Sequence, residues 1–162
     1  ITVEELSKIK GIGLAKACRI ISALELGRRV SVASQMQKFK ISSPQDIGNV
    51  YMDELRYKKK EIFRVVLLNT KNVIIGSKDI SEGSLNASIV HPREVFLEAI
   101  KKSANKMILM HNHPSGDPTP SSEDINITKR LISAGQIVGI EILDHVIIGD
   151  GSFYSFKENG QI

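Results

Sequence analysis

The sequence contains one cysteine and no long apolar run, and each of these shortages excludes a class of protein. With Cys18 alone, the chain can form neither an internal disulfide framework nor a cysteine-rich zinc finger. Any zinc would therefore be held by histidines and carboxylates. No stretch reaches the roughly 18 apolar residues of a membrane span, and no pattern of a secretory signal is present. We expect a cytoplasmic protein that has no membrane partner.

Positive charge is concentrated at the amino-terminal end of the chain. Residues 1–40 hold eight lysines and arginines against three acidic residues, whereas the other 122 residues hold fourteen against fifteen. A basic unit attached to a near-neutral one indicates that only the first meets a polyanion. The apolar content of 41% allows one substantial core plus a small appendage. We expect a small helical unit and linker in residues 1–40 and a larger domain in residues 41–162.

Two helical patterns occupy the basic unit. Apolar residues recur at helical spacing over residues 3–9 and stop at Gly11. A second pattern covers residues 15–27, whose closing glycine can end a helix. Residues 31–43 lack periodicity and are predicted to be a linker. Because the chain begins at Ile1 inside a helical pattern, we expect this unit to be truncated.

The larger domain alternates strand and helix patterns. Runs rich in β-branched residues alternate with apolar positions at helical spacing, and prolines and glycines separate them. The predicted elements are a helix at 44–55, strands at 62–68, from 73 and at 87–91, a helix from Pro92, a strand at 106–110, a helix at 122–133, and strands at 140–148 and 153–156. This order predicts a mixed α/β fold, a mostly antiparallel sheet flanked by helices, with a small N-terminal helical unit.

The segment from His111 to Asp124 carries the most specific pattern. His111 and His113 stand two residues apart at the end of a predicted strand, so their side chains share one face. A proline-rich loop then returns Asp124 on the first turn of the next helix. Two imidazoles and a carboxylate suit zinc and leave a fourth tetrahedral position open for water, whose pKa zinc lowers to about 7. The spacing predicts one zinc ion per chain, bound by His111, His113 and Asp124.

The spacing H-x-H-x7-S-x2-D is that of the JAMM (MPN-plus) metalloprotease motif, and nearly the whole sequence resembles the bacterial RadC family. The supporting stretches are residues 89–96, 111–121 and 143–149. The resemblance implies a fold like that of JAMM and cytidine-deaminase proteins, and a zinc-dependent hydrolase of peptide or isopeptide bonds. It also implies a bacterial cytoplasmic protein whose substrate is a peptide or a protein.

The resemblance further implies a general base and an oxyanion-stabilising serine. JAMM enzymes use a glutamate at the start of an earlier strand to move a proton from water to the leaving amine, and here Glu61 matches it. Glu82 and Glu94 are rival candidates, although each also fits a surface position in a turn or a first helical turn. Ser121 matches the family's serine, whose hydroxyl stabilises the tetrahedral oxyanion.

Several residues near this motif also fit structural roles. Ser121 and Asp124 are spaced as a helix N-cap and an acidic first turn, a role that can coexist with catalysis. His91 and His145 fit packing or the support of a metal ligand. Asp144 together with His145 could orient such a ligand.

The glycine-containing segment of the basic unit resembles a helix-hairpin-helix motif. Gly11 and Gly13 permit a tight turn and a close approach to a phosphate, which the N–H groups of the second helix would then face. Lys10, Lys16 and Arg19 add attraction that does not depend on base sequence. This pattern predicts contact with the backbone of double-stranded DNA. The alternative is a helix–turn–helix that serves only packing, with glycines in the turn.

Three functions are compatible with the sequence. The first is a zinc hydrolase tethered to a DNA-contacting unit. The second is a DNA-binding accessory or repair-associated protein whose JAMM domain binds metal without important turnover, and the third is a zinc nuclease. Intact ligands together with Glu61 and Ser121 favour the enzyme. A homo-oligomer is compatible with each of the three.

Overall fold

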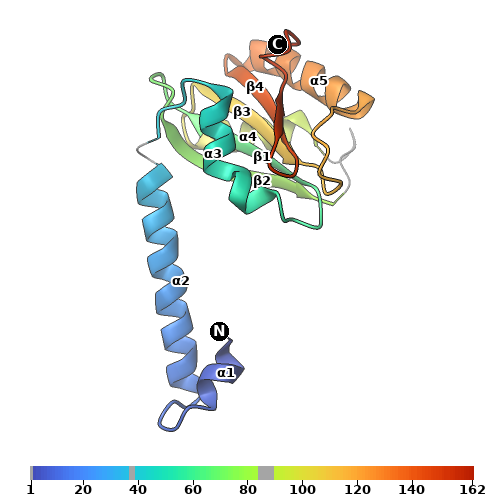
Figure 1. Cartoon of the computed structure of the whole chain (residues 1–162). Coiled ribbons are helices and arrows are strands. Elements are labelled where there is room, and N and C mark those ends of the chain that lie inside the picture. Colours follow the sequence, from blue (N-terminus) through green and yellow to red (C-terminus); the bar gives the residue numbers. More distant parts are fainter. Residues whose placement is uncertain (1, 37–38, 84–89) are drawn as a thin grey trace. The chain divides into compact units, whose positions relative to one another are not determined.

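A computed structural model describes residues 2–36, 39–83 and 90–162. Contacts within the chain divide it into two compact units, Ile1–Gln37 and Lys38–Ile162 (Figure 1). The regular structure of the first unit is helical, and the second unit contains the sheet. Among the described residues, no helix is long and apolar enough to cross a membrane.

The first unit consists of α1 (Val3–Ser7) and α2 (Leu14–Met36). Two sequence predictions are wrong here, because α2 continues through Gly27 and through residues 31–36, where a linker was expected. Gly27 does not adopt the left-handed conformation that ends many helices, and no proline follows it before the helix ends. A glycine inside a helix costs about 1 kcal/mol, which a helix of 23 residues tolerates.

Among the described residues of the second unit, five strands form one sheet, in the order β2-β1-β3-β4-β5 (Figure 1). The strands are β1 (Ile62–Leu68), β2 (Ile74–Glu82), β3 (Lys106–Asn112), β4 (Glu141–Ile148) and β5 (Phe153–Ser155). β3 and β4 run parallel, and every other neighbouring pair is antiparallel. The mixed, mostly antiparallel sheet predicted from the sequence is therefore confirmed.

The helices of the second unit are α3 (Pro44–Leu55), α4 (Pro92–Lys101) and α5 (Ser122–Val138). Helices α4 and α5 share one buried core with alternate residues of β1, namely Phe63, Val65 and Leu67. Arg64 lies between these residues in sequence and packs over the ring of Tyr51 from α3, 5.4 Å from the ring centroid. Helices therefore cover both faces of the sheet, which explains why every residue of β1 is buried.

Two elements extend further than their sequence patterns predict. β3 continues through Asn112, because His111 is still paired with Phe63 in β1. α5 continues to Val138, because only the next residue, Gly139, adopts the left-handed conformation that ends a helix, with φ of 76°. The longer β3 places His111 inside the sheet and the proline-rich loop beyond it.

The strand predicted at residues 87–91 falls largely on residues 84–89, which lie outside the described residues. Val90 and His91 are described and belong to no strand, so the prediction is wrong at these positions. His91 is exposed and caps α4, where its Nδ1 accepts a hydrogen bond from the backbone N–H of Arg93 at 3.1 Å. Pro92 at the first helical position also favours a helix start there.

Candidate metal centre

Four side chains with metal-ligating atoms come together at one end of the sheet. They are Glu61, His111, His113 and Asp124. β1 and β3 are antiparallel, so the start of β1, which follows Glu61, lies beside the end of β3, which carries His111. α5 follows the proline-rich loop and brings Asp124 back in its first turn. Strand pairing thus joins Glu61 to a motif that lies far along the chain.

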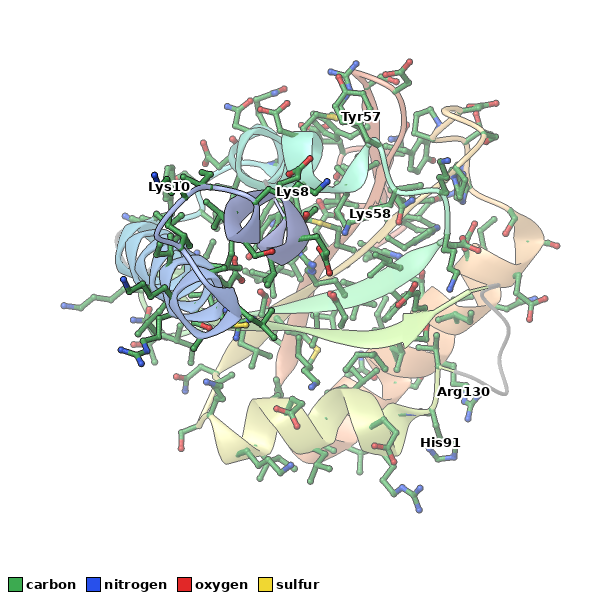
Figure 2. All side chains as sticks on the ribbon, turned by 90° about the horizontal axis from the view of Figure 1, so that it is seen from below. Lys8, Lys10, Tyr57, Lys58, His91 and Arg130 are labelled. Atoms are coloured by element: carbon green, nitrogen blue, oxygen red, sulfur yellow. The ribbon has the colours of Figure 1, made fainter. Side chains whose placement is uncertain are left out.

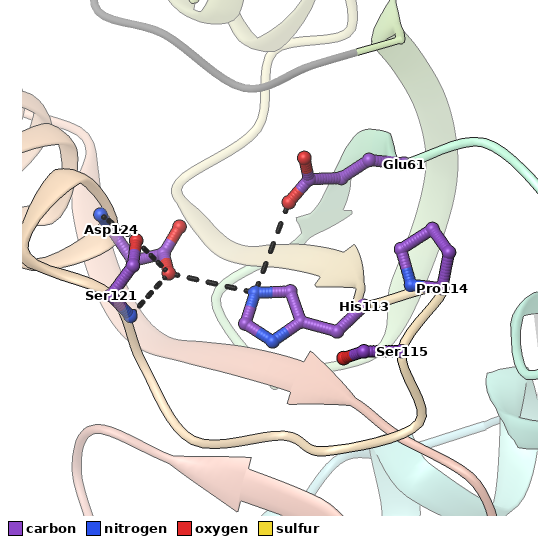
Figure 3. Close-up of a pocket in the computed structure, with 6 residues that line it drawn as sticks. All are labelled: Glu61, His113, Pro114, Ser115, Ser121 and Asp124. Atoms are coloured by element: carbon purple, nitrogen blue, oxygen red, sulfur yellow. Dashed lines mark hydrogen bonds and ion pairs between the residues drawn. The ribbon is translucent and has the colours of Figure 1, made fainter.

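A pocket of about 350 Å³ opens to solvent at this end of the sheet (Figure 3). It is lined by Glu61, His113, Pro114, Ser115, Ser121 and Asp124. Its volume is at the lower end of the range for small-ligand sites. The side chains of Glu61 and His113 are 19% and 16% exposed, whereas His111 is fully buried. A group entering from solvent would therefore meet Glu61 and His113.

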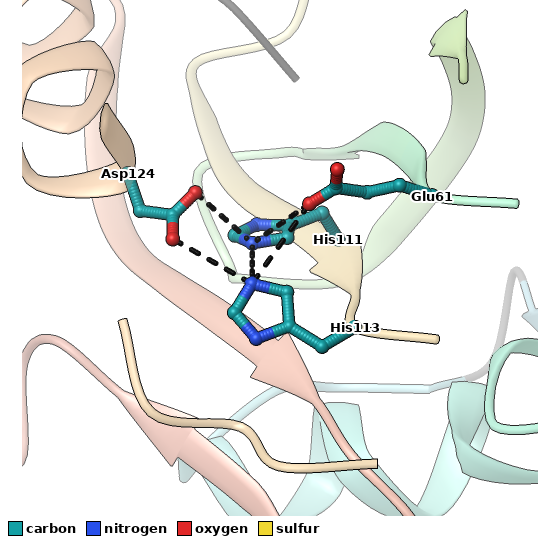
Figure 4. Close-up of side chains that lie close together, drawn as sticks. All are labelled: Glu61, His111, His113 and Asp124. Carbon is teal, nitrogen blue, oxygen red and sulfur yellow. Dashed lines mark hydrogen bonds and ion pairs between the residues drawn. The ribbon is translucent and has the colours of Figure 1, made fainter. Parts of the chain in front are cut away.

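The ligating atoms lie close to one another (Figure 4). The Nε2 atoms of His111 and His113 are 3.0 Å apart. Asp124 Oδ1 lies 3.2 Å from His111 Nε2, and Asp124 Oδ2 lies 3.5 Å from His113 Nε2. Glu61 Oε1 is 3.8 Å from both Nε2 atoms.

These separations fit a metal ion. Ligand atoms bound at about 2.1 Å to a tetrahedral zinc ion stand roughly 3.4 Å apart. The His–His distance of 3.0 Å and the two His–Asp distances of 3.2 and 3.5 Å surround that value. The distance from Glu61 to the imidazoles is longer, at 3.8 Å. The geometry therefore suits three ligands with Glu61 beside them.

His113 is oriented by the proline-rich loop. Its Nδ1 lies 2.8 Å from the backbone oxygen of Asp117, which can only accept a hydrogen bond, so Nδ1 carries a proton. The Nε2 atom is thereby turned toward the other ligands. The hydrogen bond with Asp124 raises the pKa of His113 above its ordinary value, against the opposing effect of burial. The contacts of His113 thus favour a positive charge at its imidazole.

Ser121 and Asp124 form a capping box at the start of α5, which is the structural role that their spacing allows. Asp124 Oδ2 accepts hydrogen bonds from the backbone N–H and the hydroxyl of Ser121, at 2.7 and 2.6 Å. Burial raises the pKa of Asp124, but its contacts with His111 and His113 outweigh burial and hold that pKa well below its usual range. The cap leaves Oδ1 directed at His111, so capping and metal binding are compatible.

The domain that carries this group has known relatives. A family model described as the RadC-like JAB domain matches residues 41–161. The chain belongs to the RadC family. It is 61% identical to a UPF0758 protein of Alkaliphilus oremlandii over 98% of this chain and 68% of the relative. A UPF0758 protein of Clostridioides difficile is also 61% identical, over 98% of this chain and 67% of the relative. The JAB domain and the ligand group together indicate a metal-dependent hydrolase.

The two rival glutamates of this RadC chain lie outside the ligand group found among the described residues. Glu82 is paired with Lys60 at 3.2 Å, and both side chains are largely exposed. Glu94 is paired with Arg93 at 3.0 Å, in the exposed first turn of α4. Only Glu61 among the three reaches the imidazoles.

Asn112 positions the segment that carries Glu61, and the sequence analysis did not single it out. Its Oδ1 accepts a hydrogen bond from the backbone N–H of Ile62 at 2.9 Å. Its Nδ2 donates to the backbone oxygen of Lys60 at 3.2 Å. These contacts hold the residues on both sides of Glu61. The available sequence signal is a polar residue in a buried strand, between two histidines of the opposite face.

His145 contacts the ligand group, whereas Asp144 beside it does not. Its Nε2 lies 2.8 Å from His111 Nδ1, and burial lowers its pKa well below the ordinary value. Asp144 accepts hydrogen bonds from the hydroxyl of Ser155 at 2.6 Å and from the backbone N–H of Lys157 at 2.9 Å. His145 thus supports a candidate ligand, and Asp144 holds the C-terminal turn.

The residues predicted to contact DNA lie at the start of α2 and in the loop before it. Gly11 adopts a left-handed conformation, with φ of 89°, and Gly13 does not. Lys10 is exposed in this loop (Figure 2). Lys16 Nζ donates a hydrogen bond to the backbone oxygen of Gly11 at 3.1 Å, so it also steadies the turn. The first turn of α2 contains no acidic residue.

Proposed function

We propose that this RadC chain is a zinc-dependent hydrolase of peptide or isopeptide bonds. The observation that carries the proposal is the convergence of two imidazole Nε2 atoms and the Asp124 carboxylate within 3.0–3.5 Å, in an open pocket. Zinc held there would polarise the substrate carbonyl and make water a stronger nucleophile at neutral pH. Imidazole and carboxylate ligands without cysteine are typical of catalytic zinc sites.

Glu61 is the general base in this proposal. Its carboxylate lines the pocket and lies 3.8 Å from both imidazole Nε2 atoms, so a water molecule beside them is within its reach. Glu61 would take a proton as the water oxygen bonds to the carbonyl carbon. It would deliver that proton to the nitrogen as the carbon–nitrogen bond breaks. One peptide bond and one water thus give a carboxyl group and an amine.

Ser121 is the proposed donor to the oxyanion. Its hydroxyl lines the pocket and donates to Asp124 Oδ2 at 2.6 Å. In the reaction the hydroxyl would turn to the substrate oxygen, where negative charge develops. The backbone N–H of Ser121 would keep Oδ2 in place, since it holds the same atom at 2.7 Å.

Zinc content and cleavage of a mixed peptide library test this function. We expect about one zinc per chain in protein purified without chelator, since the group offers one tetrahedral site. A chelator should abolish peptide cleavage and added zinc should restore it. His113→Ala should contain little zinc and cleave nothing. Equal zinc in wild type and His113→Ala would contradict the ligand assignment. Zinc-loaded wild type that cleaves DNA and no peptide would support a nuclease instead.

We further propose that the first unit contacts the backbone of double-stranded DNA, and that the protein works in the bacterial cytoplasm. Support comes from the left-handed turn at Gly11, the exposed Lys10 and the absence of acidic residues from the first turn of α2. Backbone N–H groups at a helix start attract phosphate. Wild type that binds zinc and DNA but cleaves nothing would favour the DNA-associated accessory function.

A further inference from the structure

A buried chain of hydrogen bonds runs from α5 to His111. Thr128 Oγ1 lies 2.5 Å from the backbone oxygen of Asp124 and 2.6 Å from His145 Nδ1. His145 Nε2 in turn lies 2.8 Å from His111 Nδ1. Thr128 is 1% exposed, and both histidines are fully buried. The protons in this chain are therefore shared among these groups rather than with bulk water.

The single proton of the Thr128 hydroxyl decides the direction of the chain. The backbone oxygen of Asp124 can only accept a hydrogen bond, and two oxygens at 2.5 Å require a proton between them. The Thr128 hydroxyl therefore donates to that oxygen. It has no second proton for His145, so it accepts a hydrogen bond from His145 Nδ1–H.

His145 is neutral, and its ring carries one N–H. Its ring stacks on Phe156 at a centroid distance of 4.9 Å and meets the edge of Phe63 at 5.7 Å, so a charged form would be buried among apolar groups at high cost. The neutral ring carries its proton on Nδ1, as Thr128 requires. His145 Nε2 is then an acceptor, and the hydrogen bond comes from His111 Nδ1–H.

We infer that Thr128 and His145 are positioning residues that hold His111 in the Nδ1–H tautomer, so that its Nε2 lone pair faces the other ligands. The inference deepens the proposed function, because it rests on a metal site at this group. The opposite tautomer would point an N–H at His113 Nε2 and Asp124 Oδ1, 3.0 and 3.2 Å away, where a metal ion needs a lone pair. Asp124 thus contributes twice, through its carboxylate and through its backbone oxygen.

The tautomers can be measured directly in the zinc-free protein. Long-range ¹H–¹⁵N NMR spectra distinguish Nδ1–H from Nε2–H histidines, and we expect Nδ1–H for both His111 and His145 in wild type. The spectra of wild type and of every variant are recorded at one and the same pH. A wild-type His111 with its proton on Nε2 would overturn the inference, whether or not zinc binds.

Substitutions at Thr128 and His145 test the role in metal binding of this hydrogen-bond relay, which runs from Thr128 through His145 to His111. Thr128→Val removes the hydroxyl, so His145 loses its Nδ1 acceptor, and Thr128→Ser keeps the hydroxyl. We expect zinc affinity, measured by chelator competition, to fall about 10–100-fold in Thr128→Val and to stay near wild type in Thr128→Ser. His145→Gln, which keeps an acceptor for His111, should bind zinc more tightly than His145→Leu. Thermal unfolding of the zinc-free variants identifies any that fail to fold.

The outcomes separate this inference from the proposed function. If Thr128→Val folds and binds zinc as tightly as Thr128→Ser with His111 still in the Nδ1–H form, the relay does not set the tautomer. If wild type shows the expected tautomers but binds no zinc, the tautomer assignment stands and the metal proposal fails. If the Thr128 and His145 variants show the expected changes in zinc affinity but wild type cleaves no peptide, only the hydrolase proposal fails.

Discussion

At the scale of single residues, Glu61 is the position where we expect a substitution to separate metal binding from the proposed hydrolysis. Its carboxylate is farther from the imidazoles than that of Asp124, at 3.8 Å against 3.2 and 3.5 Å. Glu61→Gln keeps the size of the side chain and removes the proton acceptor. We expect it to retain zinc and to lose roughly 10²–10⁴-fold in hydrolysis rate.

Elemental analysis and peptide-cleavage rates of the same preparation check the Glu61 prediction. Loss of zinc from Glu61→Gln would make Glu61 a metal ligand. Full hydrolysis would show that no carboxylate at this position acts as the base. Glu82→Gln is a matched control, because Glu82 is paired with Lys60 outside the ligand group and should keep both zinc and activity.

Asn112 offers a second test at the residue scale. Asn112→Ala leaves the buried N–H of Ile62 without its acceptor, at 2.9 Å in the present structure, and frees the segment that carries Glu61. We expect a loss of about 1–3 kcal/mol in the free energy of unfolding, measured with urea. Hydrolysis should fall more than zinc content, since the ligands are untouched. Asn49→Ala, at an exposed position of α3, should change neither hydrolysis nor zinc content.

At the scale of elements, two helical glycines that look alike in sequence are expected to respond in opposite ways to alanine. A Cβ at Gly135 in α5 would lie 2.6 Å from the backbone oxygen of Ile140 and 3.4 Å from Phe96. We expect Gly135→Ala to destabilise the protein by about 1–3 kcal/mol. A Cβ at Gly27 in α2 meets nothing within 4 Å, so Gly27→Ala should stabilise its helix by about 1 kcal/mol.

Urea denaturation of the second unit and helix content of the first unit measure the two glycine effects. Stabilisation by Gly135→Ala would mean that the turn after α5 relaxes freely and that its close packing on Ile140 is not needed. No effect of Gly27→Ala would mean that Gly27 does not determine the helix content of α2.

The elements differ in how well local sequence predicts them. The helix at 44–55 was predicted with its observed bounds, because Pro44 at its first position gives a clear start signal. β1 was likewise predicted at residues 62–68, since burial on both faces makes it an apolar run that only Arg64 interrupts. The end of α2 was not predicted correctly. A glycine such as Gly27 ends a helix only where its backbone is left-handed, and the residue type alone does not specify that conformation.

At the scale of the whole molecule, the two units are expected to divide DNA binding from hydrolysis. If the first unit contacts phosphates, duplex binding should be independent of base sequence and fall with salt. Three basic contacts, from Lys10, Lys16 and Arg19, give a log–log slope of about −3, because each contact contributes about 0.9. Reversal of Lys10 and Lys16 to Glu should weaken duplex binding without changing zinc content or peptide cleavage. Chelation of zinc should leave duplex binding intact.

A salt titration of duplex binding by the whole chain measures this division. Reversal of Lys71 and Lys101 to Glu in the second unit is the matched control, because it changes the net charge by the same amount. Equal losses of affinity in both double variants would mean that net charge alone, and not the first unit, drives binding. Absence of binding by wild type would leave the first unit as a packing element and would not affect the hydrolase proposal.

The sequence by itself determined the mixed α/β fold and the local half of the candidate site. His111 and His113 stand two apart where β3 ends, and Asp124 follows in a first helical turn; both placements depend only on short-range periodicity. Only the tertiary structure decided which glutamate reaches these residues and that Asn112 and His145 support them. Those contacts join residues far apart in the chain, and strand pairing and helix packing, rather than sequence spacing, bring them together.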